Sequence, residues 1–197
     1  MVNKYLNFIT VFILCLVNES YSQVWSGSLS FGDKAATLYP FAQAFDKTFY
    51  PVTQLAAEYQ YFEKKQHSIF QTAVFHFQDH KLLGYGLGLR SEAGYRYLFS
   101  NGFFPEVLLG IGYLGTIPSE KQFKLNENGI YKEADPLISM IEIPFTIGIG
   151  YQWKNRYSVF LRYQYSAQFP YNNTIPVVPS DNFLLGFRIK ILKMKKK

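Results

Sequence analysis

The strict alternation of residues 141–153, I-E-I-P-F-T-I-G-I-G-Y-Q-W, constrains the fold more than any other feature of this sequence. Every odd position is large and apolar or aromatic, and every even position is polar, small or proline. Because successive side chains on a β-strand point to opposite faces, the segment is predicted to be a strand with one apolar face. That face ends in Tyr151 and Trp153, residue types that favour a membrane–water interface. The pattern is typical of a transmembrane β-barrel strand with lipid outside and a polar lumen inside.

The composition agrees with a barrel and disfavours other classes. Aromatic residues make up 19% of the chain, which suits a protein that must both girdle a bilayer and fill a narrow interior. A mean hydropathy near zero excludes a bundle of membrane helices, whereas alternating strands average to such a value. The net charge of +6 owes much to the lysines at 193 and 195–197, and no nucleic-acid motif accompanies them. Nucleic acid is therefore not an expected partner.

The first 22 residues have the features of a secretory signal peptide. Lys4 supplies the positive charge, residues 6–17 form an apolar run, and residues 20–22 give a small-x-small cleavage site before Gln23. Cys15 lies inside the apolar run, so the mature chain would have no cysteine. We therefore expect no disulfide, no thiolate nucleophile and no cysteine-based metal site.

Alternation and turn residues divide residues 23–192 into eight candidate strands, followed by a basic tail at 193–197. The strands are predicted at 24–31, 52–62, 69–77, 85–99, 103–116, 141–153, 157–169 and 182–192. The first alternates weakly, and the third is apolar on both faces, which leaves their phases open. The predicted fold is all-β, an eight-stranded antiparallel up-and-down transmembrane β-barrel.

The connections between these strands alternate in length. Segments 32–50, 117–137 and 170–181 are long, whereas 63–68, 100–102 and 154–156 are short, and only the short connection 78–84 interrupts the pattern. Bacterial barrels have short periplasmic turns and longer extracellular loops. We therefore expect an outer-membrane protein with both mature termini in the periplasm.

Several strands end in Gly-Tyr or Tyr-x-Tyr. These endings are Tyr59-Gln60-Tyr61, Tyr95-Arg96-Tyr97, Gly112-Tyr113, Gly150-Tyr151 and Tyr163-Gln164-Tyr165. Together with the leader and the alternating aromatic strands, they make the chain resemble the small outer-membrane β-barrel proteins of Gram-negative bacteria, the porin-like and OmpA-like barrels. The resemblance covers essentially the whole mature chain, but it is architectural and implies no catalytic signature.

Charged residues fall on the face opposite the apolar one. The predicted lumen set is Glu58, Arg90, Glu92, Arg96, Glu106, Glu142, Arg162, Arg188 and Lys190. An eight-stranded barrel is just wide enough for side chains to fill, and buried charges persist only when paired. We expect a salt-bridge network that closes the lumen. The alternative is a gated conduit or small-ligand site, for which Glu106 and Glu142, facing the arginines, are the residues to test.

The three histidines are interpreted as interface or turn residues. His76 and His80 flank Asp79 at a short outer connection, and His67 precedes Ser68 in a predicted turn. Because neighbours on a strand point to opposite faces, His67 and Ser68 would not form a base–nucleophile pair. We assign no catalytic residue, no metal ligand and no cofactor.

The predicted outer loops hold the remaining candidates. The aromatic residues of segment 32–50 are too apolar to be left simply solvated, so they either cover the barrel mouth or meet a partner. These are Tyr39, Phe41, Phe45, Phe49 and Tyr50. Segment 117–137 is polar and of mixed charge, which favours a solvated loop near lipid. The expected partners are outer-membrane lipid and an envelope protein that binds the extracellular loops.

The leading functional hypothesis is a non-enzymatic barrel with a structural, surface-binding or envelope-complex accessory role. The rivals are an enzyme that acts on outer-membrane lipid and a narrow solute channel. A soluble lipocalin-like barrel, apolar inside and polar outside, would show the same alternation, but the aromatic and charged faces favour the membrane protein.

Overall fold

The computed structural model describes residues 24–36, 50–80, 84–119, 123–125, 131–133, 137–170 and 176–191. The predicted signal peptide and the basic tail at 193–197 lie outside these residues. Among the described residues, no helix has both the length and the hydropathy needed to cross a bilayer.

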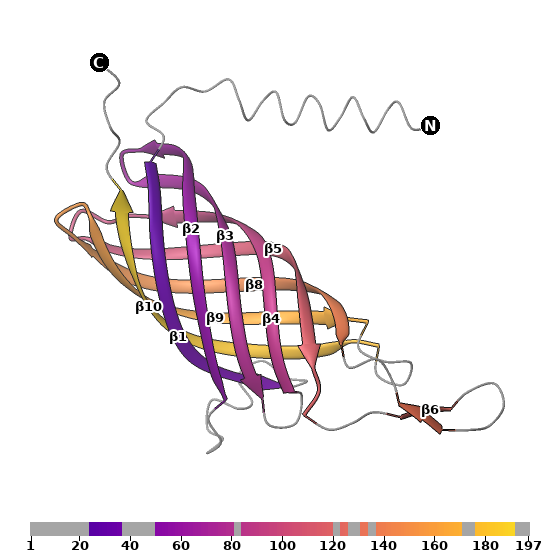
Figure 1. Cartoon of the computed structure of the whole chain (residues 1–197). Coiled ribbons are helices and arrows are strands. Elements are labelled where there is room, and N and C mark those ends of the chain that lie inside the picture. Colours follow the sequence, from indigo (N-terminus) through magenta and orange to yellow (C-terminus); the bar gives the residue numbers. More distant parts are fainter. Residues whose placement is uncertain are drawn as a thin grey trace, which may run out of the picture.

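Eight strands form one closed antiparallel barrel (Figure 1), in the order β1-β10-β9-β8-β5-β4-β3-β2. Their bounds are β1 Val24–Ala36, β2 Pro51–Lys64, β3 His67–His80, β4 Gly84–Tyr97, β5 Phe103–Ile117, β8 Ile138–Trp153, β9 Tyr157–Phe169 and β10 Val178–Ile191. Each strand except the first pairs with its predecessor in the barrel, and β1 closes the barrel on β10. The predicted eight-stranded up-and-down barrel is confirmed.

The two ends of the barrel differ in their connections. β1 begins and β10 ends at one end, which we call the turn end because it also holds the short connections 65–66, 98–102 and 154–156. The opposite end, the loop end, holds connections 37–50, 81–83, 118–137 and 170–177. Within the third of these, β6 Phe123–Leu125 and β7 Tyr131–Glu133 form a separate two-stranded sheet. The sequence analysis had interpreted that whole segment as a solvated loop.

Among the strands that extend further toward the loop end than their sequence pattern predicts, β1 and β10 extend the most. β1 continues to Ala36, which pairs with Ser180 of β10, and β10 begins at Val178, which pairs with Gln168 of β9. Residues 32–36 and 178–181 carry little alternation of their own. Residues 32–36 pair with residues 180–184 of β10, about 150 positions away in the sequence, and Val178 and Pro179 pair with Gln168 and Ala167 of β9, so a local pattern does not reveal these extensions.

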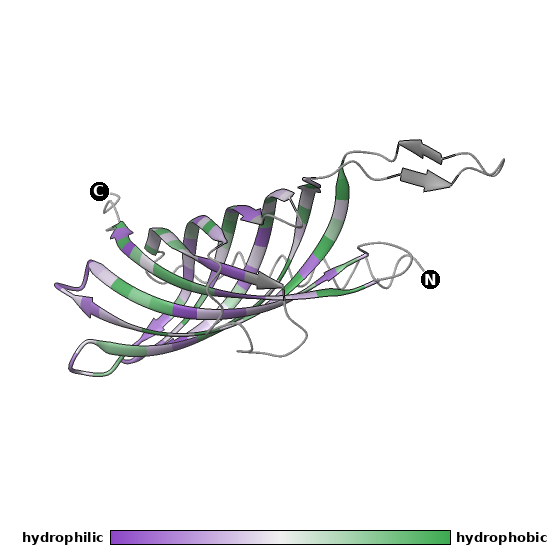
Figure 2. Cartoon of the chain, turned by 90° about the horizontal axis from the view of Figure 1, so that it is seen from below, coloured by the Kyte–Doolittle hydropathy of each residue, from purple (hydrophilic) through white to green (hydrophobic). Residues whose placement is uncertain are grey.

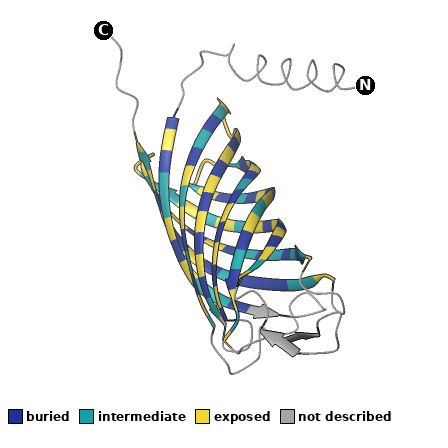
Figure 3. Ribbon diagram, turned by 45° about the vertical axis from the view of Figure 1, so that its right-hand side comes forward, coloured by how far each residue is buried: buried dark blue, intermediate teal, exposed yellow. Residues whose placement is uncertain are grey.

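Buried and exposed residues alternate along the eight barrel strands (Figure 3), and hydrophilic and hydrophobic residues alternate along them as well (Figure 2). Ile141, Phe145 and Tyr151 of β8 are 42%, 48% and 48% exposed on the outer face, while Glu142 is 1% exposed. The phases left open by the sequence are now settled. In β1, serines 26 and 30 point inward, and in β3 the inward set contains Phe70, Val74 and His76.

Glycines opposite large side chains make the lumen packing possible. Phe70 faces Gly94 across the β3–β4 ladder, and Phe160 of β9 faces both Gly150 of β8 and Gly186 of β10. A Cβ built on Gly94 would lie 2.5 Å from two atoms of the Phe70 ring. Since the bore of an eight-stranded barrel is only as wide as its side chains, each ring needs such a gap beside it.

We predict that Gly94→Ala destabilises the barrel by about 1–3 kcal/mol, because the added methyl overpacks the lumen against Phe70. The measurement is the urea midpoint of the refolded barrel in detergent, followed by the mobility shift between boiled and unboiled samples. Gly27→Ala is the matched control, since a Cβ at Gly27 meets nothing within 4 Å. Equal midpoints for the two variants would contradict this packing.

Candidate functional site

Five charged side chains meet in the turn-end half of the lumen, and we call them the arginine cluster. They are Glu58, Glu106, Arg96, Arg162 and Arg188, each at most 5% exposed. The Arg96 guanidinium donates from Nη1 and Nη2 to the two carboxylate oxygens of Glu58 at 3.0 and 2.8 Å, in a bidentate pair. Such pairs are among the strongest hydrogen-bonded contacts in proteins.

Glu106 is the shared acceptor of the arginine cluster. Its carboxylate accepts from Arg162 Nε at 2.7 Å and from Arg96 Nε at 2.9 Å. Arg188 Nη2 donates to the same carboxylate at 3.2 Å, and its Nε lies 3.2 Å from Glu58 Oε2. Three guanidinium groups from β4, β9 and β10 therefore converge on a single β5 carboxylate.

Three phenylalanine rings lie against these guanidinium groups. Arg96 stands 4.3 Å from the ring centroid of Phe70, and Arg162 stands 4.3 Å from that of Phe160. Arg188 lies 4.9 Å from Phe160 and 5.7 Å from Phe104. The rings give the arginine cluster a fully buried apolar surface and a favourable cation–π contact.

Charged and amide side chains occupy the loop-end half of the lumen. Arg90 donates from Nε to Glu92 at 2.8 Å and from Nη2 to Gln164 Oε1 at 3.0 Å. The same Gln164 oxygen accepts from Asn182 at 3.0 Å and from Gln54 at 3.2 Å. Four strands are thus tied together through one buried amide.

Glu142 has a second set of partners in this half. Its Oε2 lies 3.5 Å from both Arg90 Nη1 and His76 Nε2, and its Oε1 accepts from Gln168 Nε2 at 3.3 Å. Lys34, which is 1% exposed, donates from Nζ to Gln78 Oε1. Ionic and amide contacts therefore continue from the arginine cluster toward the loop end.

His76 is not the interface or turn residue that its place in the sequence predicted. Its side chain is 1% exposed inside the lumen beside Glu142 rather than at an interface or turn. It faces Gly88 across the β3–β4 ladder, and that glycine leaves room for the ring. Lys34 and Gln78, which were predicted to lie in the connections 32–50 and 78–84, were also missed as lumen residues, whereas the buried Gln54, Gln164 and Gln168 lie on the polar faces of their predicted strands. His76 is an even number of residues from Phe70 and Val74, so the three side chains lie on the same face of β3. This spacing is the signal that could have placed the histidine in the lumen.

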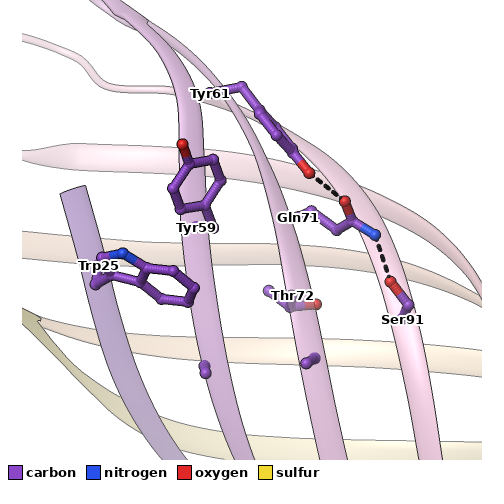
Figure 4. A pocket seen from close by; sticks show the side chains of 8 residues that line it. Trp25, Tyr59, Tyr61, Gln71, Thr72 and Ser91 are labelled. Atoms are coloured by element: carbon purple, nitrogen blue, oxygen red, sulfur yellow. Dashed lines mark hydrogen bonds between the residues drawn. The ribbon is translucent and has the colours of Figure 1, made fainter. Parts of the chain in front are cut away.

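Polar groups on the outer surface pair with one another. A shallow depression of about 330 Å³ crosses β1–β4, with Trp25 and Tyr59 at its side (Figure 4). At its rim the Tyr61 hydroxyl donates to Gln71 Oε1, and Gln71 Nε2 donates to Ser91 Oγ at 2.6 Å. Mutual pairing of this kind is what polar side chains need where water is excluded.

Solved structures give this architecture a context. Neisserial surface protein A aligns with a TM-score of 0.58 at 11% identity, covering 86% of this chain and 97% of that protein. The N-terminal barrel domain of Pseudomonas aeruginosa OprF aligns at 0.51 with 13% identity, covering 86% and 99%. The attachment invasion locus protein Ail of Yersinia pestis aligns at 0.50 with 12% identity, covering 86% and 98%. No protein-family model and no curated protein matches the chain.

The chain has the fold of the small outer-membrane β-barrels. Of its predicted lumen charges, all but Lys190 are buried inside this barrel. Lys190 lies instead at the rim of the turn end, where its Nζ donates to both oxygens of Glu63 at 2.7 and 2.9 Å. It is the last inward-facing position of β10, and its long side chain reaches the strand end rather than the arginine cluster.

The other predicted residues are placed less completely. The aromatic residues at 39, 41, 45 and 49 and the side chain of His80 lie outside the described part of the barrel. The half-buried Tyr50 donates its backbone N–H to Asp33 Oδ1 at 2.6 Å. His67 is exposed with Nδ1 2.6 Å from the Tyr95 hydroxyl, and Ser68 is buried on the opposite face. Within the described residues, no group of three His, Cys, Asp or Glu side chains could hold a metal ion.

We predict that Glu106→Gln destabilises the barrel by about 3–5 kcal/mol, because three buried guanidinium groups lose their shared counter-charge. Glu63→Gln, which breaks the exposed rim pair with Lys190, should cost about 0–1 kcal/mol. Urea midpoints of the two variants, measured in the same detergent, provide the check. A Glu106→Gln barrel as stable as the Glu63→Gln barrel would show that the arginine cluster does not stabilise the fold.

Proposed function

We propose that this protein is an integral outer-membrane barrel with a closed lumen, and that its role is structural, surface-binding or accessory to an envelope complex. Its loop end would face the cell exterior, and both mature termini would lie in the periplasm. The apolar outer face and the short turns beside the chain ends support this orientation.

The occupied lumen is the observation that carries the proposal. In the turn-end half, the arginine cluster and the rings of Phe70, Phe104 and Phe160 pack against one another. A solute could pass only if these buried ion pairs were broken, which would leave charges unpaired in a narrow bore. This packing supports a closed barrel over a solute channel.

The histidines whose side chains are described support a non-enzymatic role. His67 contacts Tyr95 on the outer surface, and His76 is enclosed in the lumen beside Glu142. With the lumen filled, recognition of an envelope protein falls to the loop end, where the β6–β7 sheet and the aromatic segment at 39–50 lie in the sequence. The proposed contacts are an envelope protein partner and outer-membrane lipid.

We predict that the wild-type barrel gives no stepwise conductance in planar bilayers, because the arginine cluster and its rings fill the bore. Phe104→Ala combined with Phe160→Ala removes two of the rings and should produce measurable steps. Phe145→Ala combined with Phe187→Ala is the matched control, since these two phenylalanines face outward at 48% and 39% exposure. Steady conductance by the wild-type protein would overturn the closed-lumen proposal.

Cysteine labelling tests the orientation. Val177→Cys places an exposed thiol at the loop end, and Ser100→Cys places one at the turn end. We expect a membrane-impermeant maleimide to label position 177 on intact cells and position 100 only after the outer membrane is permeabilised. The reverse pattern would contradict the proposed orientation.

A further inference from the structure

The turn end carries a pocket that the closed lumen does not explain. Its volume is about 390 Å³, and the three turns and the last residues of β8 line it. Lys65 and Lys154 belong to this lining together with Phe99, Tyr151 and Trp153, which we call the aromatic wall. The pocket therefore brings two lysines and an aromatic surface together.

The pocket is electropositive. In the part of the chain that the structure describes, neither Lys65 nor Lys154 has a carboxylate partner. The exposed carboxylate of Glu63 lies beside these turns, and it already forms a salt bridge with Lys190. The two lysines are thus available to an anionic ligand from outside the protein.

The backbone at both lysines adopts a conformation that suits other residues better. Lys65 has φ 53° and Lys154 has φ 52°, both in the left-handed region that glycine and asparagine adopt at least cost. Tight β-hairpin turns require this backbone conformation, so the two short turns hold both lysines at defined positions in the pocket lining.

The aromatic wall indicates which anion would enter. Tyr151 and Trp153 end the outward face of β8, and Phe99 is 42% exposed beside them. Aromatic residues at strand ends lie where a bilayer meets water. A ligand that touches both the rings and the lysines is therefore held at the membrane interface, whereas a cell-wall polymer would approach from the aqueous side.

We propose that this pocket binds the phosphate-bearing head group of an anionic glycerophospholipid in the leaflet around the turn end. The two lysines pair with the phosphate, and the rings lie against the glycerol and the first carbons of the acyl chains. This inference rests on the proposed membrane insertion of the barrel, and it adds a specific lipid site to it.

The test uses the refolded full barrel in nanodiscs of equimolar phosphatidylglycerol and phosphatidylcholine, with native mass spectrometry of the lipid that stays bound. The wild type should retain phosphatidylglycerol several-fold over phosphatidylcholine, and less so at high salt. Lys65→Gly with Lys154→Gly should abolish the excess, while glycine relieves the left-handed backbone and keeps the turns folded. Lys64→Ala with Arg156→Ala removes the same charge from exposed residues outside the pocket and should keep the excess.

Each other result counts against a specific claim. A folded, inserted wild-type barrel without a phosphatidylglycerol excess overturns the lipid site and leaves the proposed function intact. Equal losses in the two double variants would show a diffuse basic rim instead of a pocket. Lysine-dependent binding to isolated peptidoglycan without lipid preference would assign the pocket to the cell wall. Failure of the heat-induced mobility shift in every form would overturn the membrane proposal itself.

Discussion

The narrow bore of an eight-stranded barrel is the constraint on which the rest of this structure depends. Every inward side chain must find space, and every inward polar group must also find a polar partner, among a few neighbours. Space comes from glycines set opposite large side chains, as at Phe70 and Gly94. Polar partners are shared, since Glu106 forms ion pairs with Arg96, Arg162 and Arg188 at once. The packing volume and the charge pairing of the lumen are therefore coupled. A change in the size of one inward side chain would disturb the ion pairs, and a change in charge would disturb the packing.

The two halves of the lumen meet this constraint in different ways. The arginine cluster has three arginines for two glutamates, and the rings beside it offset the excess positive charge through their faces. The loop-end half pairs Arg90 with Glu92 and Glu142 and extends these contacts through neutral amides. An amide can donate and accept at once, so Gln164 links four strands without adding charge. The barrel is thus joined across its bore as well as around its wall.

Much of this fold could be predicted from the sequence because alternation is a local property that each strand carries by itself. The alternation from Ile141 to Trp153 identifies the outer face of this strand without reference to any neighbouring strand, and the eight strands follow from similar patterns. What the sequence could not provide depends on pairing across the barrel. The loop-end extension of β1 depends on β10, the room for His76 depends on Gly88, and the partner of Lys190 is Glu63, 127 residues away. The β6–β7 sheet was missed because three-residue strands are too short to show a period.

Position decides what a positive charge can do in this molecule. The guanidinium groups of the arginine cluster are buried against carboxylates and rings, where they stabilise the barrel and lie away from its surface. Lys65 and Lys154 have the same sign of charge at the turn end, yet they lie on turns rather than strands and face outside the bore. The proposed closed lumen would leave recognition to the two ends of the barrel. In the functions proposed above, the turn end binds lipid through Lys65 and Lys154 on short turns, and the loop end carries the longer segments proposed to contact an envelope partner.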